Sequence, residues 1–249
     1  MKPLLQIIHL KKDYHTDNGE IEAIKDLSLS IENGVFIAIV GPSGCGKSTL
    51  LSILCNIEKK SDGKIIYGKD HIKIGYMLQQ DTLFPWLNVL ENALLGLKIN
   101  SNINEETKKH TITLINNYGL SDFVNFYPSA LSGGMRQRVA LIRTLAINPD
   151  ILLLDEAFSS LDYQTRLEVS NDVYKIIKKE KKTTIMVTHD ISEAISMADI
   201  VIVLTKRPCT IKNVYKIDLR EYDNPLDKRT DKVFNEYYKA IWKDLDIHV

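Results

Sequence analysis

The fold is decided by an apolar run and the glycine-rich turn that follows it: Val35-Phe-Ile-Ala-Ile-Val40, then Gly41-Pro-Ser-Gly-Cys-Gly-Lys-Ser48. The apolar run has the composition of a central parallel strand that is buried on both faces. The turn fits the pattern G-x-x-x-x-G-K-[ST], and helical periodicity follows it as far as Ile57. A strand, a glycine-rich loop and a helix in this order predict a phosphate-binding loop, in which inward N–H groups and the positive end of the helix meet phosphate oxygens.

Two residues of this loop are expected to carry specific chemistry. Lys47 is expected to reach the β- and γ-phosphates, and the Ser48 hydroxyl to hold Mg²⁺. A structural glycine turn is the alternative, and it is disfavoured because the strand, the helix, the lysine and the serine all occur together. Cys45 lies inside the loop and is interpreted as a small residue tolerated there rather than as a redox group.

The composition is that of an ordinary globular protein. The chain has 249 residues, with 32 Lys and Arg against 32 Asp and Glu, so its formal net charge is zero. That balance argues against a protein that grips nucleic acid through bulk positive charge. No apolar run approaches the roughly 18 residues of a membrane-spanning helix, and three widely spaced cysteines fit a reducing compartment. These features predict a soluble intracellular protein without a nucleic-acid partner.

Strand and helix signals alternate along the chain. Two strands, Leu4–Leu10 and Ala23–Ile31, flank a polar turn and predict an antiparallel β-subdomain at the N-terminus. Strand signals return at Ile151–Leu154, Thr183–Thr188 and Asp199–Leu204, with helical stretches between them. Such alternation predicts an α/β fold with a mostly parallel sheet and crossover helices.

Helical periodicity dominates an insertion between the strands, at about residues 88–148, with patterns at Thr107–Tyr118 and Leu120–Phe126. Past Lys206, a weak strand at Ile211–Ile217 precedes an amphipathic helix. The apolar residues of that helix are Val233, Phe234, Tyr237, Tyr238, Ile241, Trp242 and Leu245. We therefore predict one domain over residues 1–249, with a helical subdomain at about 88–148 and a C-terminal strand and helix at 206–249.

A later strand ends in two carboxylates. Asp155 and Glu156 directly follow Ile151–Leu154. Because parallel strands present their carboxyl ends at one edge of a sheet, we expect this pair beside the phosphate loop, with Asp155 organising Mg²⁺ and Glu156 polarising an attacking water. Thr183–Thr188 ends next to His189, which becomes a candidate contact for the γ-phosphate. A lone histidine is more often a surface or capping residue.

A second glycine turn lies beyond the helical insertion, in Leu131-Ser-Gly-Gly-Met-Arg-Gln-Arg138. At the start of a helix it predicts a second anion-binding site, because N–H groups and the helix dipole point outward there. Taken alone, a Ser-Gly-Gly turn is common at helix starts. Because the turn lies just upstream of Asp155 and Glu156, its combination with that pair and with the phosphate loop is diagnostic of the class of protein.

Together these motifs resemble those of the ATP-binding cassette (ABC) ATPases, the nucleotide-hydrolysing subunits of transporters, over nearly the whole chain. The phosphate loop resembles the family's Walker A motif with its P-loop NTPase core, Ile151–Glu156 resembles Walker B, and Leu131–Met135 resembles the signature loop. Ser159–Asp162 resembles the D-loop. The chain departs from the family pattern at Met135, where Gln is commoner, and at Ala157-Phe158, where Pro-Thr is usual.

The resemblance implies ATP and Mg²⁺ as ligands and assigns individual roles. Glu156 and His189 (the switch histidine) are the expected catalytic residues, Gln79 is the expected Q-loop glutamine, and Tyr14 is the aromatic expected to stack on adenine. The residues expected to bind the chain's own nucleotide are Tyr14, Gly41, Pro42, Ser43, Gly44, Cys45, Gly46, Lys47, Ser48, Thr49 and Gln79. Those expected to contact the nucleotide of a second copy are Ser132, Gly133, Gly134 and Asp162, and those expected to hold the metal are Ser48, Gln79 and Asp155.

The family's site is composite, because the signature loop of one subunit covers ATP on the phosphate loop of another. The resemblance therefore implies a head-to-tail homodimer at the cytoplasmic face of the membrane, bound to a separate integral membrane permease and indirectly to an extracytoplasmic substrate-binding protein. Phe84 and Trp86 follow Gln79 in an apolar patch and are expected to receive a permease helix. Burial of both aromatics in the core is the open alternative.

Met135-Arg-Gln-Arg138 together with Pro85-Trp86 resembles the subgroup that energises uptake of nitrate, aliphatic sulfonates, taurine or thiamine precursors. This pattern favours an importer of a small solute. Two other classes stay open. A soluble cassette ATPase acting in DNA repair or translation usually carries coiled-coil insertions or two cassettes, and a P-loop kinase for a small molecule would have no use for Leu131–Met135.

Overall fold

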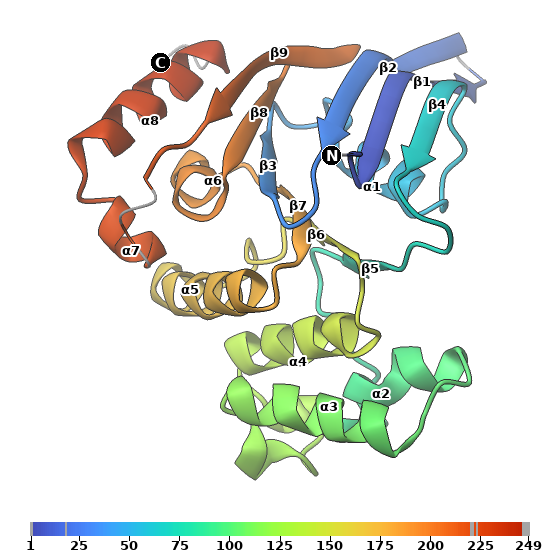
Figure 1. The fold of residues 1–249 in the computed structure, drawn as a ribbon, viewed down its shortest axis with the longest axis vertical. Coiled ribbons are helices and arrows are strands. Elements are labelled where there is room, and N and C mark those ends of the chain that lie inside the picture. The colour runs from blue at the N-terminus through green and yellow to red at the C-terminus, as the bar shows by residue number, and fades with distance from the viewer. Residues whose placement is uncertain (1, 18, 220–221, 223, 246–249) are drawn as a thin grey trace. The chain divides into compact units, whose positions relative to one another are not determined.

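The computed structural model describes residues 2–17, 19–219, 222 and 224–245. The chain divides into two compact units, one formed by the residues up to 72 and from 174 onward, the other by Lys73–Val173. Both units combine strands with helices, and the predicted α/β class is confirmed (Figure 1). None of the helices within the described ranges is long and apolar enough to cross a membrane.

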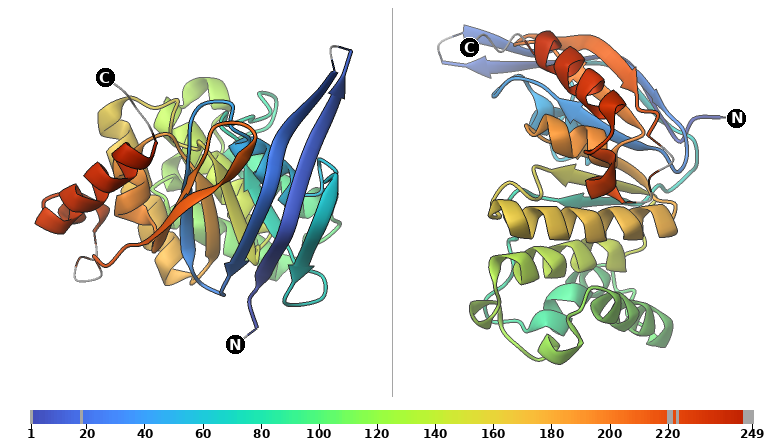
Figure 2. Two further views of the ribbon diagram at one scale, coloured as in Figure 1. Left: turned by 90° about the horizontal axis from the view of Figure 1, so that it is seen from above. Right: turned by 90° about the vertical axis from the view of Figure 1, so that its left-hand side faces the viewer.

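The first unit opens with an antiparallel layer, as predicted. The strand β1 (Leu5–Thr16) pairs with β2 (Gly19–Ile31) on one side and with β4 (Asp62–Tyr67) on the other. Figure 2 shows β1 and β2 as a long hairpin in its left panel. The hairpin continues beyond the predicted limits at Leu10 and Ala23, because backbone pairing does not require apolar side chains on an exposed ribbon.

Parallel strands form the core of the same unit. The strand β3 (Phe36–Val40) lies between β7 (Thr183–Val187) and β8 (Ile200–Leu204) and is parallel to both. The strand β9 (Cys209–Lys216) pairs antiparallel with β8 and parallel with β2, so the strand order within this unit is β4-β1-β2-β9-β8-β3-β7. Every residue of β3 is buried, which explains its continuous apolar run. Every residue of β7 is buried as well, including Thr183 and Thr184.

Helices cover this sheet. The helix α6 packs on β3 and β8, and α8 packs on α6 (Figure 1). On α8 the predicted apolar face is only partly buried: Phe234 and Ile241 are covered, whereas Val233 is exposed. The helices of this unit are α1 (Lys47–Leu54), α6 (Ile191–Met197), α7 (Pro225–Lys228) and α8 (Lys232–Asp244).

The second unit contains the parallel pair β5 (Ile74–Met77) and β6 (Ile151–Asp155). The helix predicted at Leu120–Phe126 is wrong, because only Ser121–Phe123 forms a short 3₁₀ turn. The carbonyls of Val124 and Phe126 instead accept hydrogen bonds from the first N–H groups of α2, so this backbone serves as a cap. The helices are α2 (Val89–Ile99), α3 (Glu105–Asn117), α4 (Gly133–Ala146) and the start of α5 (Tyr163–Lys179).

Candidate functional site

The phosphate loop joins β3 to α1 in the first unit. Gly44 and Gly46 have φ angles of +69° and +121°, which residues with a side chain rarely adopt. A Cβ on Gly46 would also meet the Ala23 carbonyl oxygen at 3.3 Å and the Cys209 sulfur at 3.4 Å. Both the backbone angles and the close packing therefore require glycine, which is the physical reason for the motif's spacing.

The side chain of Lys47 points back toward the start of the phosphate loop. Its buried Nζ donates hydrogen bonds to the carbonyl oxygens of Gly41 (2.9 Å) and Pro42 (3.1 Å). These acceptors are neutral, so they orient the ammonium group without cancelling its charge, and the loop keeps a positive charge for an anion. Burial raises the pKa of the neighbouring Cys45 thiol, although Lys47 opposes the shift. Cys45 is thus a neutral thiol near pH 7, in agreement with its interpretation as a small buried residue.

Arg207 supports the phosphate loop from outside. Its Nε and Nη2 donate hydrogen bonds to the Gly44 carbonyl oxygen at 3.1 and 2.7 Å. The sequence does not mark this residue, because it lies 163 positions after Gly44, in the loop that follows β8, and belongs to no motif. The guanidinium group both fixes the loop and adds a second positive charge beside it.

Tyr14 lies on β1, where its hydroxyl donates to Thr49 Oγ1 of α1 over 3.4 Å. The ammonium group of Lys12 lies 4.4 Å from the centroid of the Tyr14 ring, and it is held there by Glu58 Oε2 and the Lys59 carbonyl, each at 2.8 Å. One face of the ring therefore carries a cation, and the other can stack on a base. No motif in the sequence marks Lys12.

His189 follows β7 and is exposed. The strand β7 runs parallel to β3, and the Thr188 N–H donates to the Ile39 carbonyl oxygen at 3.2 Å. Parallel neighbours end at the same edge of a sheet. The fold thus brings His189 to the edge at which the phosphate loop begins at Gly41.

Two carboxylates lie at the end of β6 in the second unit. Asp155 is buried, and its Oδ2 accepts a hydrogen bond from the Tyr76 hydroxyl on β5 at 2.9 Å. Glu156 has a φ angle of +45°, an uncommon conformation for a residue with a side chain, so the chain turns sharply as the strand ends. Gln79 Nε2 donates to Glu156 Oε2 at 3.4 Å and to Ser159 Oγ at 3.2 Å. The carboxylate expected to activate water is thereby oriented by the expected Q-loop glutamine.

The three side chains assigned to Mg²⁺ are chemically suited to that ion. A serine hydroxyl (Ser48), an amide oxygen (Gln79) and a carboxylate (Asp155) are the hard oxygen ligands that Mg²⁺ prefers. The two hydrogen bonds of the Gln79 side chain use Nε2, which leaves its Oε1 as the atom for a cation.

The second glycine turn forms the start of α4. Ser132 caps this helix, since its Oγ accepts from the Met135 N–H at 3.3 Å. A Cβ on Gly134 would lie 2.7 Å from Thr165 Cγ2, so close packing between α4 and α5 requires glycine. Asp162 accepts from the Thr165 N–H at 3.0 Å, and this hydrogen bond lowers the pKa of the Asp162 carboxyl. Both Ser132 and Asp162 are exposed.

Comparison with known proteins shows the family of this chain. Residues 24–159 match the family model described as ABC transporter. The chain belongs to the ABC transporter family. It is an ATP-binding subunit of such a transporter, and ATP hydrolysis is the activity of this class of ATPase.

Several relatives of this ABC ATPase align along most of its length. An uncharacterized ABC transporter ATP-binding protein of Bacillus subtilis, YtlC, is 44% identical, with 97% of this chain and 95% of the relative aligned. The aliphatic sulfonates import ATP-binding protein SsuB of Bacillus cereus is 32% identical, covering 97% of this chain and 96% of the relative. Among solved structures, the dimeric ABC transporter cassette MJ0796 superposes with a TM-score of 0.73 at 32% identity, covering 86% of this chain and 99% of that one. The same cassette has been solved as a dimer in a post-hydrolysis state bound to ADP and Pi.

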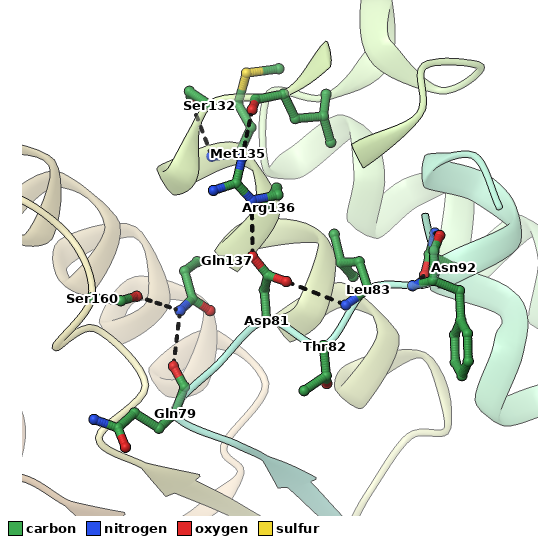
Figure 3. Close-up of polar contacts among 12 residues, drawn as sticks. Gln79, Asp81, Thr82, Leu83, Asn92, Ser132, Met135, Arg136, Gln137 and Ser160 are labelled. Carbon is green, nitrogen blue, oxygen red and sulfur yellow. Dashed lines mark hydrogen bonds and ion pairs between the residues drawn. The ribbon is translucent and has the colours of Figure 1, made fainter. Parts of the chain in front are cut away.

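The apolar patch that follows Gln79 in this ABC ATPase is exposed. Phe84 is 38% exposed and Trp86 68%, and their ring centroids lie 5.1 Å apart. The alternative that Trp86 belongs to the core is therefore wrong. The buried Asn92 holds this segment, since its Oδ1 accepts from the Phe84 N–H at 2.9 Å (Figure 3). Its Nδ2 also donates to the Leu87 carbonyl oxygen at 2.8 Å.

Proposed function

We propose that this ABC transporter ATPase energises the import of a small solute of the nitrate, sulfonate, taurine or thiamine-precursor type through a separate membrane permease. The similarity to SsuB, which is named for aliphatic sulfonates import, supports this proposal. The observation that carries the coupling to a permease is the exposed Phe84–Trp86 pair on the segment after Gln79.

In the proposed reaction, the loop Gly41–Ser48 binds the phosphates of ATP, and Lys47 stabilises the charge on the β- and γ-phosphates. The adenine ring stacks on the face of Tyr14 opposite Lys12. Lys47 is already held within this loop by the carbonyl oxygens of Gly41 and Pro42.

We assign the activation of water to Glu156, which accepts the proton as water attacks the γ-phosphate in line. Gln79 orients the Glu156 carboxylate, and His189 contacts the γ-phosphate. When bound at Ser48, Gln79 and Asp155, Mg²⁺ supplies positive charge that offsets the charge of the phosphates.

The composite site requires a second copy of the chain. The N–H groups at the start of α4, together with Ser132, Gly133, Gly134 and Asp162, contact the nucleotide of that copy. Support comes from the exposure of Ser132 and Asp162 and from the similarity to MJ0796, which is described as dimeric. Phe84 and Trp86 bind a cytoplasmic helix of the permease, which places the ATPase peripherally at the inner face of the membrane and connects it indirectly to a substrate-binding protein outside.

Reconstitution tests the function. The chain is purified with its permease in proteoliposomes, and ATP-dependent accumulation of labelled sulfonate, taurine, nitrate and thiamine precursor is measured beside phosphate release. Accumulation of one of them, with phosphate released to water, is the expected result. Efflux of the solute would refute import. Transfer of phosphate to a small molecule would identify a kinase instead.

A further inference from the structure

Arg143 of α4 holds the backbone of Asp81 and Thr82, which lie two and three positions after Gln79, the Q-loop glutamine. Its Nη2 donates to the Asp81 carbonyl oxygen at 2.8 Å and to Thr82 Oγ1 at 3.1 Å, and its Nη1 donates to the Thr82 carbonyl oxygen at 2.9 Å. Thr82 has a φ angle of +44°, an unfavourable conformation for a β-branched residue. The planar guanidinium group thus stabilises a turn that the local sequence does not favour.

Arg136 adds a second contact from the same helix. Its Nε forms an ion pair with Asp81 Oδ2 at 2.9 Å, and its Nη1 donates to the Leu131 carbonyl oxygen at 2.9 Å (Figure 3). One guanidinium group therefore ties the segment after Gln79 to the residue that precedes the signature loop.

Gln137 provides the third contact. This side chain is buried, and its Nε2 donates to the Gln79 carbonyl oxygen at 3.3 Å and to Ser160 Oγ at 3.1 Å (Figure 3). Ser160 lies in the D-loop, so Gln137 fixes the backbone of the Q-loop glutamine relative to that loop. Through Arg136, Gln137 and Arg143, one helix thus contacts residues 79, 81 and 82.

The segment 79–82 lies between two functional features. At its start, Gln79 reaches Glu156 at 3.4 Å, and just after its end lie the exposed rings of Phe84 and Trp86. We propose that Arg143, assisted by Arg136 and Gln137, is a positioning residue that keeps this segment in the conformation that both features need. The inference rests on the proposed function, in which Glu156 activates water and Trp86 binds the permease.

The same helix offers a matched control. Arg138 instead forms an ion pair with Asp172 Oδ2 on α5 at 3.0 Å. Arg143→Lys and Arg138→Lys both keep the charge and remove the planar set of donors. The donors lost in Arg143→Lys bind the segment 79–82, whereas the donor lost in Arg138→Lys binds Asp172.

The experiment uses the full chain carrying Trp242→Phe, which leaves Trp86 as its only tryptophan. Time-resolved fluorescence anisotropy of Trp86 and steady-state ATPase kinetics are measured for both lysine variants. We expect Arg143→Lys to increase the amplitude of fast Trp86 motion and to lower kcat by roughly 10- to 100-fold, as expected for a misplaced catalytic group. KM for ATP should stay within about twofold, because the phosphate loop is unchanged. Arg138→Lys should alter neither Trp86 motion nor kcat.

The two measurements distinguish a failure of this inference from a failure of the proposed function. Unchanged Trp86 motion in folded Arg143→Lys would overturn the inference. Increased Trp86 motion with unchanged kcat would support the conclusion that Arg143 holds the segment 79–82. It would also refute the catalytic role of the contact between Gln79 and Glu156. If Arg143→Lys does not fold by circular dichroism, Asp81→Asn weakens the ion pair with Arg136 and leaves the backbone acceptors of Arg143 in place. Asp81→Asn is then expected to cause the same changes to a smaller degree. If it leaves both Trp86 motion and kcat unchanged, the inference is overturned.

Discussion

Truncation of Trp86 distinguishes a docking residue from a core residue. Trp86 is 68% exposed, so about a third of it is covered. A tryptophan side chain buries about 150–250 Å² when fully covered, which makes the covered part of Trp86 roughly 50–80 Å². At about 25 cal/mol per Å², Trp86→Ala should lower the free energy of unfolding by about 1–2 kcal/mol. Loss of an indole from a packed core would cost about 3–5 kcal/mol.

The assay combines a thermal melt of the isolated ATPase with uptake by the assembled transporter. For a chain of this size, 1 kcal/mol shifts Tm by about 2–4 °C, so a decrease of about 2–8 °C is expected. ATP affinity should be unchanged, assembly with the permease should weaken, and uptake should be lost, since truncating an aromatic anchor costs about 2 kcal/mol or more of binding. Ile99→Ala is the control, because Ile99 is 73% exposed on α2 and has no proposed role. A fall in Tm well above about 10 °C, or normal uptake by Trp86→Ala, would refute the docking role.

Three further substitutions test the nucleotide site. Tyr14→Ala should weaken ATP binding by about 1–3 kcal/mol in calorimetry, whereas Tyr14→Phe should be nearly neutral because the hydroxyl contact to Thr49 is long at 3.4 Å; equal losses would exclude stacking. Ser132→Arg should retain ATP binding in the isolated chain and lose both dimerisation and hydrolysis, and hydrolysis that is first order in enzyme and insensitive to this change would exclude a two-subunit site. Arg207→Ala should weaken ATP affinity by roughly three- to tenfold through loss of the support at Gly44, with Lys206→Ala as the control, and equal affinities in the two variants would show that the loop needs no such support.

The sequence predicted the elements whose chemistry is local. The phosphate loop is marked by glycines that its backbone angles require, and β3 and β6 are marked by apolar runs, because both strands are buried along their whole length. Asp155 and Glu156 could be placed because the end of such a strand is easily located.

Features that depend on distant partners could not be predicted. The strand β5 is short and half covered, so it lacks an apolar run, and Leu120–Phe126 has helical periodicity although its backbone caps α2. Arg207 and Arg143 act on loops far away in the sequence, through bonds to backbone carbonyls that no side-chain pattern marks. For Trp86, burial and exposure were equally plausible, and only the tertiary packing decides between them.

The oligomeric state and turnover of Glu156→Gln with ATP test the central claim most directly. The substitution keeps the size of the side chain and removes the proposed base, so hydrolysis should fall by about 10²–10⁴-fold while ATP stays bound. Because unhydrolysed ATP would hold two copies together, size-exclusion chromatography should show a monomer without nucleotide and a stable dimer with ATP. Wild-type turnover in this variant, or a monomer at saturating ATP, would contradict an ATPase in which Glu156 activates water within a two-subunit site.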